Sequence, residues 1–369
     1  MIPVNIPKLG EREKELLAEC IDSGWISSEG PFVTEFEDRM ASQAGRAFGI
    51  AVCNGTAALD VGLAAIGIGP GDEVIVPTFT IISCIHQIVR AGARPVFVDS
   101  DAATYNLCVN DVEAKITPRT RAVMAVHIYG LPVDMEPLLE ITERHGLFLI
   151  EDAAEAIGQT YNGQACGSFG DLSTFSFYPN KLITTGEGGM VVTDDPDLAQ
   201  RCRSIRNLCF QSGKRFYHEE LGWNYRMTNL QAALGIAQLE RLDESIVRKR
   251  EIGRFYNQSF DSLRHVQLPL NATPYAKNIY WVYAIVLHDT YSHDAAFVIE
   301  ALKSAGIGSR PFFWPLHEQP VLKTMGLVKK ENHPVAERIA RKGLYLPGGL
   351  GTTDKELEEV ADVLKGIVG

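Results

Sequence analysis

The chain has 369 residues, of which 46% are hydrophobic and 22% are charged, and its formal net charge is −11 at pH 7. This length exceeds what one hydrophobic core usually holds, so we expect a globular protein of two domains. The acidic balance disfavours binding to nucleic acid or anionic membranes, although it permits a locally basic pocket. The seven scattered cysteines, the lack of a signal-peptide core and the lack of a long apolar run predict a cytoplasmic protein without a membrane span.

Helical and strand patterns alternate along the first part of the chain. Two amphipathic segments that each end at a glycine predict helices, at residues 11–24 and 32–45. Short apolar runs separated by segments of helix length predict strands at residues 48–54, 72–77, 94–99, 122–130 and 147–152. This alternation is typical of an α/β fold with a mostly parallel sheet that helices cover on both faces.

The pattern changes in the last third of the chain. Residues 224–260 predict a long helical stretch of the kind that bridges domains. Beyond about residue 246, a smaller α+β pattern follows, with a strand at 281–287 and helices at 295–306 and 354–368. We therefore expect a large α/β domain over residues 1–245 and a small C-terminal α+β domain over residues 246–369.

A candidate anion site follows the first predicted strand, where Asn54, Gly55, Thr56 and Ala57 begin a helix. Ligands of open α/β sheets collect at the carboxyl ends of the strands. Glycine there lets the backbone approach a ligand, and the free N–H groups and the helix dipole favour a phosphate. A plain helix cap by Asn or Thr would explain the same residues.

An acidic pair, Glu151 and Asp152, closes a strongly apolar strand. A carboxylate at that depth needs a cation or a strong donor as its partner. A protonated pyridine nitrogen would serve, because the carboxylate raises the pKa of that nitrogen and the charged ring becomes an electron sink. A helix cap or a metal ligand is the alternative, but no cluster with metal-ligand spacing surrounds Asp152, so we expect no metal.

Lys181 lies between an aromatic, strand-like run and a cluster of glycines. Burying its charge is costly, and formation of a Schiff base with pyridoxal phosphate is one way to remove that charge. Taken alone, Lys181 could be a loop lysine beside a turn. Ser176 precedes it by five positions and could add a hydroxyl to a phosphate site. The order of phosphate-binding helix start, strand-end aspartate and lysine is the one that pyridoxal phosphate enzymes of the aminotransferase fold type use.

A more specific resemblance is carried by the segments GDEVIVPTFT, VDSD, VHIYG, IEDAAEAIG, GSFGDLSTFSF, NKLITTGEGGM and NYRMTNLQAALGIAQLE. Over essentially its whole length, the chain resembles the sugar-nucleotide aminotransferases of the DegT/DnrJ/StrS family. Within that family, SGWISSEGPFVTEFE and SRPFFWPLH are most similar to the GDP-perosamine synthases. The resemblance implies a fold type I transferase, like aspartate aminotransferase, that forms a homodimer with active sites at the subunit interface. It also implies pyridoxal 5′-phosphate as cofactor, L-glutamate as amino donor and a nucleoside-diphosphate keto sugar as acceptor.

The resemblance also implies a role for individual residues. Lys181 would hold the cofactor as a Schiff base and, once released, would move the proton between the cofactor and the sugar carbon. Asp152 matches the partner of the pyridinium nitrogen, and Glu155 stands where many relatives have a glutamine near the phenolic oxygen. The residues that match the phosphate-binding part of the site are Gly55, Thr56, Ala57, Ser176 and, from the neighbouring subunit, Asn224.

Two positions depart from the family pattern. Relatives commonly have an aromatic residue that stacks on the cofactor ring where this chain has Ile81, so either an aliphatic contact covers the ring or Phe79 takes a larger part. The segment RNLCFQSGKRFYHEE, residues 206–220, also differs from the glycine-rich run of similar relatives, and we expect this loop to touch substrate.

Three further side chains are candidates for substrate binding. Arg226, Arg310 and His317 could meet the pyrophosphate of a nucleotide, because guanidinium groups suit phosphate oxygens. Ordinary structural ion pairs would explain these residues equally well. His127 ends a strand and fits a satisfied, half-buried histidine better than a catalytic base.

Together these features predict a reversible ping-pong transamination. L-Glutamate would give its amino group to a nucleotide-linked 4-keto-6-deoxy sugar, and the product would be a 4-amino-4,6-dideoxy sugar nucleotide, GDP-perosamine in the favoured case, for O-antigen or another surface polysaccharide. The nearest alternative is a 3-aminotransferase, or another 4-aminotransferase, that acts on dTDP- or UDP-linked keto sugars. The sugar dehydratases of the same fold replace the lysine with histidine, which Lys181 disfavours. A binding protein of this fold without catalytic activity is the alternative from a different class.

Overall fold

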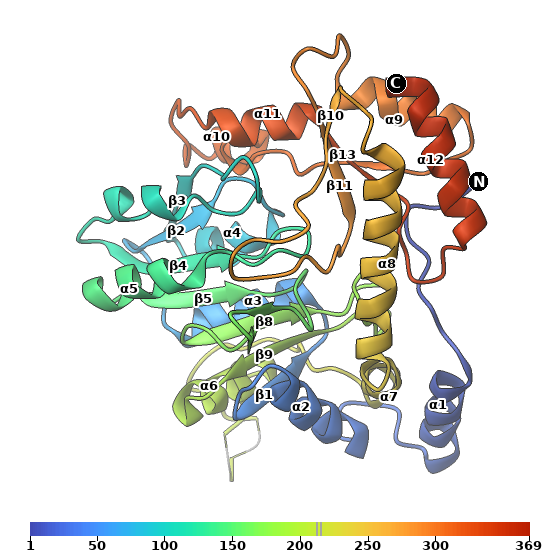
Figure 1. Cartoon of the computed structure of the whole chain (residues 1–369). Helices are drawn as coiled ribbons and strands as arrows, with labels where there is room; N and C mark the ends of the chain where they lie inside the picture. The colour runs from blue at the N-terminus through green and yellow to red at the C-terminus, as the bar shows by residue number, and fades with distance from the viewer. Residues whose placement is uncertain (212, 215) are drawn as a thin grey trace.

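The computed structural model describes residues 1–211, 213–214 and 216–369. Within these residues, a central sheet of seven strands is joined by a second sheet of four strands and a two-stranded hairpin (Figure 1). The central strands are β1 (Phe48–Val52), β2 (Glu73–Pro77), β3 (Arg94–Val98), β4 (Thr120–Val126), β5 (Phe148–Asp152), β8 (Leu172–Ser176) and β9 (Gly189–Thr193). The hairpin consists of β6 (Thr160–Tyr161) and β7 (Gln164–Ala165).

The central sheet has the strand order β1-β9-β8-β5-β4-β2-β3. Strand β9 is antiparallel to both of its neighbours, β1 and β8, and the strands from β8 to β3 pair in parallel. The carboxyl ends of β1, β2, β4, β5 and β8 therefore meet at one edge of the sheet, which is where ligands of open α/β sheets bind. The predicted mostly parallel α/β fold is confirmed.

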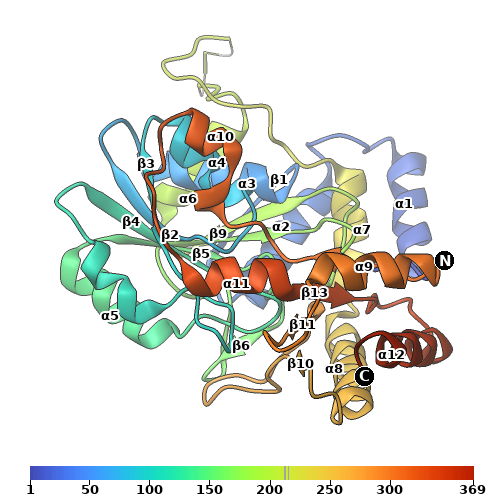
Figure 2. The same ribbon diagram turned by 90° about the horizontal axis from the view of Figure 1, so that it is seen from above.

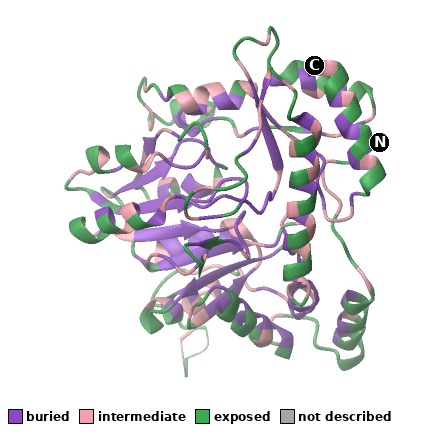
Figure 3. Cartoon of the chain, viewed as in Figure 1, coloured by how far each residue is buried: buried purple, intermediate pink, exposed green. Residues whose placement is uncertain are grey.

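Helices cover both faces of this sheet, and Figure 3 shows the strands buried between helices whose outer sides are exposed. On one face, alternate strand residues pack with α3 (Gly55–Ala65), α4 (Ser83–Arg90) and α6 (Pro196–Arg206). On the other face pack α2 (Pro31–Gln43), α5 (Met135–His145) and α7 (Asn229–Leu239), with α1 (Glu11–Ser23) against α7. The short 3-10 turns η1 (Val109–Asp111) and η2 (Glu113–Lys115) follow β3. Because side chains of a strand alternate between faces, burial on both faces explains the nearly continuous apolar runs in the sequence.

The second sheet is antiparallel and belongs to the C-terminal part of the chain. Its strands, in the order β10-β11-β13-β12, are β10 (Val266–Gln267), β11 (Tyr283–Leu287), β12 (Arg310–Pro311) and β13 (Gly343–Leu346). The associated helical elements are α9 (Ala295–Ser304), η3 (Leu316–Glu318), α10 (Pro320–Thr324), α11 (Pro334–Lys342) and α12 (Asp354–Val368). Figure 2 shows α9 and α12 beside this sheet, with the two chain termini near them.

The long helix α8 (Leu242–Phe260) contributes to two cores. Its first turns place Leu242 and Ile246 in the core with α2 and α7, and its later turns place Tyr256 and Phe260 in the core of the small sheet. Ile2 also packs in that second core, so the start of the chain returns to the C-terminal part. The predicted division at residues 245 and 246 therefore falls inside a helix and stays a prediction.

The sequence predicted one helical stretch over residues 224–260, and the structure differs. It has two helices, α7 and α8, which are separated by Glu240 and Arg241 (Figure 1). Arg241 has φ −115° and ψ 14°, outside the helical region. The interruption lets α7 pack on α1 and α2 while α8 runs toward the small sheet, so tertiary packing outweighs the local helical preference.

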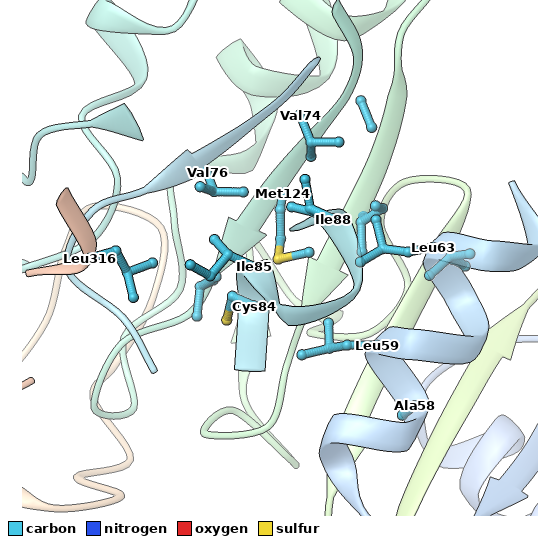
Figure 4. Close-up of a cluster of buried hydrophobic side chains, with 14 of the residues drawn as sticks. Ala58, Leu59, Leu63, Val74, Val76, Cys84, Ile85, Ile88, Met124 and Leu316 are labelled. Carbon is cyan, nitrogen blue, oxygen red and sulfur yellow. The ribbon is translucent and has the colours of Figure 1, made fainter. Parts of the chain in front are cut away.

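The segment after β12 packs against the core of the large sheet. Figure 4 shows Leu316 beside Val76 and Ile85, which belong to β2 and α4. The backbone N–H of Leu316 also donates to the carbonyl oxygen of Thr78 at 2.7 Å. Because Thr78 directly follows β2, this contact fixes the C-terminal part of the chain beside the site edge of the sheet.

Candidate active site

A cavity of about 630 Å³ lies at the carboxyl edge of the central sheet. Its lining includes one residue at or within three positions of the carboxyl end of each of five strands: Asn54, Thr80, Val126, Asp152 and Ser176. Of the predicted site residues, seven line this cavity: Gly55, Thr56, Ala57, Asp152, Glu155, Ser176 and Lys181. The structure thus brings these seven residues together, although they span more than 120 positions of the chain.

Lys181 follows β8 in a tight turn, in which its backbone N–H donates to the carbonyl oxygen of Tyr178 at 2.8 Å. Its Nζ lies 3.8 Å from Glu155 Oε1 and 4.0 Å from the centre of the Trp281 ring. Burial lowers the pKa of Lys181, and the negative charges of Glu155 and Asp152 only partly oppose this effect. A lowered pKa favours the neutral amine, which is the form that attacks a carbonyl group to form an imine.

Asp152 ends β5 and has a side chain that is almost completely buried. Its Oδ1 accepts the backbone N–H of Ala154 at 3.0 Å, and its Oδ2 accepts the thiol of Cys84 at 3.4 Å. Desolvation raises the pKa of Asp152, while the backbone N–H of Ala154 and the charge of Lys181 lower it. A carboxylate in this position is suited to a cationic partner inside the cavity, because such a partner compensates for the lost hydration.

Glu155 lies three residues beyond Asp152 and accepts the backbone N–H of Tyr129 at 2.8 Å. Desolvation raises the pKa of Glu155 to about 7, although Lys181 and the Tyr129 N–H oppose this shift. The carboxyl group therefore changes its charge near neutral pH and can either donate or accept a hydrogen bond there.

The start of α3 forms the anion-binding end of the cavity. Asn54 caps the helix, with its Oδ1 accepting the backbone N–H of Ala57 at 2.8 Å, so this N–H is already used. The N–H groups of Gly55 and Thr56 belong to the first turn of α3 and have no carbonyl partner within the helix, so an anion is favoured there. A Cβ at position 55 would lie 2.7 Å from Ser176 Cβ, so glycine is required for this close approach.

Of the two residues considered for stacking on the cofactor ring, only Ile81 lines the cavity, and the stacking role itself stays a prediction. Ile81 lines the cavity and is 48% exposed in the single chain. Phe79 is fully buried and packs against Tyr129, Phe312 and Phe313 rather than lining the cavity. Of the two possibilities for this departure, the structure therefore places Ile81 at the cavity and Phe79 in the core.

Other cavity residues were not singled out from the sequence. Trp281, Phe313 and Tyr345 come from the C-terminal part of the chain and line the same cavity. The indole N–H of Trp281 donates to the carbonyl oxygen of Asn180 at 2.9 Å, which ties this ring to the turn that carries Lys181. The sequence gives no local signal for these residues, because only the packing of the small sheet brings them to the cavity.

Three polar residues that contact one another in the cavity lining were also not predicted from the sequence. His86 Nδ1 lies 3.2 Å from Asp60 Oδ1, and the Tyr225 hydroxyl donates to Asp60 Oδ2 at 3.4 Å. All three residues line the cavity. Asp60 lies on α3 and His86 lies on α4. A carboxylate within the otherwise apolar sequence of α3 is the feature from which this cluster could have been predicted.

The remaining predicted residues lie outside this cavity in the single chain. Asn224 is exposed, and Arg226 donates to the side chain of Asn207. Arg310 lines an adjoining pocket. His317 is buried, with Nδ1 2.7 Å from Thr78 Oγ1 and Nε2 3.2 Å from Glu337 Oε1, so both ring nitrogens have protein partners.

Two further predictions concern His127 and the loop over residues 206–220. His127 is fully buried, with Nε2 2.8 Å from Glu151 Oε1, and its Nδ1 accepts the backbone N–H of Val133, as expected for a satisfied histidine. In the loop, residues 212 and 215 lie outside the described residues, and the predicted substrate contact stays a prediction. Among the described residues, no helix is both long and apolar enough to span a membrane.

The arrangement fits pyridoxal phosphate. Lys181 lines the cavity with a pKa lowered by burial, and the buried carboxylate of Asp152 is suited to a cationic partner. The helix that begins at Gly55 packs closely against Ser176. Fold and site together define a pyridoxal phosphate-dependent aminotransferase of fold type I. The DegT/DnrJ/EryC1/StrS aminotransferase family model matches residues 7–365, and the chain belongs to this family.

Individual relatives agree with this assignment. The chain is 43% identical to a GDP-perosamine synthase of Caulobacter vibrioides, with 98% of this chain and 97% of that protein covered. It is 42% identical to a GDP-perosamine synthase of Vibrio cholerae, with 99% and 98% covered. Among solved structures, the aminotransferase TlmJ from Streptoalloteichus hindustanus superposes with a TM-score of 0.93 at 31% identity, covering 99% and 98%. The PLP form of Spr1654 from Streptococcus pneumoniae superposes with a TM-score of 0.93 at 26% identity, covering 100% of this chain and 98% of that chain.

Proposed function

We propose that this aminotransferase transfers the amino group of L-glutamate to the 4-keto group of GDP-4-keto-6-deoxymannose and so makes GDP-perosamine. The main support is that two relatives named GDP-perosamine synthase match nearly the whole chain at 42% and 43% identity. The product would be a precursor of O-antigen or another surface polysaccharide. The cavity of about 630 Å³ falls within the range of roughly 300–1,000 Å³ that is typical of small-molecule sites.

Lys181 has two tasks in this proposal. Pyridoxal phosphate, when bound, supplies an aldehyde that forms an imine with an amine and a ring that acts as an electron sink. Lys181 would hold the cofactor and, once released, its Nζ would carry a proton between the exocyclic carbon of the cofactor and the reacting carbon of the donor or the sugar. Burial supports this role because it lowers the pKa of Lys181, and Trp281 at 4.0 Å limits the approach of water to the amine.

Asp152 and Glu155 set the electrostatics around this amine. Asp152 would receive the protonated ring nitrogen, and its two existing partners, Ala154 N–H and Cys84, fix the orientation of the carboxylate. Glu155, with a pKa of about 7 and a distance of 3.8 Å to Lys181 Nζ, would share a proton with the ring hydroxyl of the cofactor. Gly55, Thr56, Ala57 and Ser176 would hold the phosphate.

The proposed enzyme is a homodimer in which each site includes a residue of the second subunit. Asn224 is exposed and does not line the cavity of its own chain, whereas Ile81, Ile82 and Tyr178 leave exposed apolar surface at or beside the cavity. Exposed apolar surface of this kind often marks a protein contact. A second copy of the chain that places its Asn224 beside the start of α3 would cover this exposed apolar surface.

Mixing two inactive variants tests the shared site. In a heterodimer of Lys181→Ala and Asn224→Ala subunits, one of the two sites would have both Lys181 and Asn224. Random mixing gives about half heterodimers, so about 25% of wild-type activity should return. If the mixture stays as inactive as its components while heterodimers are shown by mass, Asn224 does not act across the interface.

The reaction itself is tested by incubating the enzyme with L-glutamate and a panel of GDP-, dTDP- and UDP-linked keto sugars. We expect amination of the GDP-linked 4-keto sugar, and two-dimensional NMR of the product should place nitrogen on carbon 4. Nitrogen on carbon 3, or reaction with only a dTDP- or UDP-linked sugar, would refute the specific assignment and retain the aminotransferase class.

A further inference from the structure

A second, smaller pocket of about 230 Å³ adjoins the Lys181 cavity. The two share four lining residues, Tyr178, Asn180, Trp281 and Tyr345. The indole of Trp281 therefore faces Lys181 and also borders the second pocket. The second pocket thus begins within one side chain of the reactive amine.

Two cations line this second pocket, Lys249 from α8 and Arg310 from β12. Its described lining contains no aspartate or glutamate. Two basic groups without a carboxylate favour an anion in the pocket. Lys249 is buried, whereas Arg310 is exposed at the side of β12.

Lys249 is the more unusual of the two residues. Its side chain is buried, with 5% exposure, and Nζ donates to the carbonyl oxygen of Gly348 at 2.6 Å. An ammonium group has three N–H donors, so one carbonyl leaves this buried cation undersatisfied. Burial alone, with no opposing charge, lowers the pKa of Lys249 to about 7.

The contrast with another buried cation supports this interpretation. The side chain of Arg46 is also only 5% exposed, but it pairs with Asp194 and donates to the carbonyl oxygens of Gly167, Phe169 and Gly170. Arg46 is therefore satisfied by the protein itself. Among the described residues, neither Lys249 nor Arg310 forms an ion pair with an aspartate or a glutamate.

We propose that this pocket binds the distal carboxylate of the amino donor, L-glutamate, with Lys249 and Arg310 as its cationic ligands. The proposal rests on the proposed function and specifies how the same site recognises its donor. Arg310 was predicted to meet a nucleotide pyrophosphate, and the pocket volume favours a smaller anion. About 230 Å³ is below the range of roughly 300–1,000 Å³ typical of sites for larger ligands, so this pocket alone can hold a carboxylate but not a whole nucleoside diphosphate.

The donor half-reaction tests this proposal without any sugar nucleotide. Cofactor-loaded Lys249→Met and Arg310→Met enzymes would be mixed with L-glutamate or with L-alanine, which lacks the distal carboxylate, and the cofactor spectrum followed by stopped flow. We expect the second-order rate constant of this half-reaction with glutamate to fall about 100-fold in Lys249→Met, where a buried charge-assisted contact is lost. In Arg310→Met it should fall about tenfold, because Arg310 is exposed. Both losses should come mainly from weaker glutamate binding. The reaction with alanine should change less than threefold.

A binding measurement and a control accompany the kinetics. Glutarate, a dicarboxylate without an amino group, should bind the loaded wild-type enzyme in calorimetry and bind both variants at least tenfold more weakly. Lys323→Met removes an exposed cation on α10 outside both pockets and should leave donor kinetics and glutarate binding unchanged.

Three outcomes would overturn the inference. Equal losses with glutamate and alanine would show that Lys249 and Arg310 only support the fold. A loss confined to the reaction of the pyridoxamine phosphate-loaded enzyme with the keto sugar nucleotide would assign the pocket to a phosphate of the acceptor. Unchanged glutamate kinetics would show that the donor binds elsewhere. By contrast, a wild-type enzyme that does not react with glutamate at all would refute the proposed donor itself.

Discussion

Gly55→Ala is the substitution whose effect can be worked out most directly from the structure. A Cβ at this position would lie 2.7 Å from Ser176 Cβ and 2.9 Å from Ser176 Oγ. Favourable contacts between such atoms lie near 3.5–4.0 Å. Ser176 is held in β8 opposite Gly189 of β9, so it cannot withdraw easily.

We expect Gly55→Ala to lower the free energy of unfolding by about 1–3 kcal/mol, the usual cost of adding a methyl group to a packed site. The same displacement moves the first turn of α3 and the Ser176 hydroxyl apart. Affinity for pyridoxal phosphate should therefore fall at least tenfold, which corresponds to about 1.4 kcal/mol. Titration of the cofactor-free protein, followed by absorbance, measures this affinity, and chemical denaturation measures the stability.

Two further variants test whether the effect comes from the contact between position 55 and Ser176. Gly366→Ala adds a methyl group in α12, where nothing lies within 4 Å, and should leave cofactor affinity unchanged with stability equal or higher. Adding Ser176→Gly to Gly55→Ala removes the clash and should restore stability without restoring affinity. A Gly55→Ala protein with wild-type affinity and stability would refute the close packing of α3 against β8.

Three further predictions concern the acid–base groups. Lys181→Ala should lose the spectrum of lysine-bound cofactor and at least 1,000-fold in turnover while the far-ultraviolet circular dichroism stays unchanged. Asp152→Asn keeps the shape of the side chain but removes its charge, so kcat should fall at least 100-fold, and a smaller loss would argue against a charged partner. The pKa of Glu155 is about 7 in the folded protein and about 4.5 in the unfolded chain. Between these pH values the folded protein keeps a proton on Glu155 that the unfolded chain has lost. The free energy of unfolding of the cofactor-free protein should therefore fall as pH rises from about 4.5 to 7. Glu155→Gln should remove that decline, by up to roughly 3 kcal/mol in denaturation at pH 8, and equal pH slopes for both proteins would contradict the assigned shift.

Much of the fold follows from patterns that are local in sequence. The predicted helix starting at Gly55 begins there, and the helix predicted to end at Gly24 has that residue as its left-handed cap, with φ 76°. Local patterns do not predict an interruption of a helix that depends on tertiary packing. The break at Glu240 and Arg241 has no glycine or proline to announce it, and it exists because α7 and α8 serve different cores.

The site divides in the same way. Asp152, Ser176 and Lys181 could be predicted because each stands beside the end of a strand, and strand ends share one edge of the sheet. Trp281 and Tyr345 could not, because they reach the cavity from a second sheet whose position depends on tertiary contacts such as Leu316 with Thr78.

Lys249 shows why residue type and pattern alone miss a binding group. In the sequence, Lys249 belongs to the charged run RKRE, which is typical of the solvent-exposed face of a helix. The structure buries it beneath Gly348, while its neighbour Arg248 reaches Asp354 in a partly exposed ion pair. Two adjacent cations on one helix therefore have opposite environments, and only the buried one lacks an acidic partner. Burial without a counterion lowers the pKa of Lys249 to about 7, so an anionic ligand in the pocket would supply the counterion that stabilises its charged form.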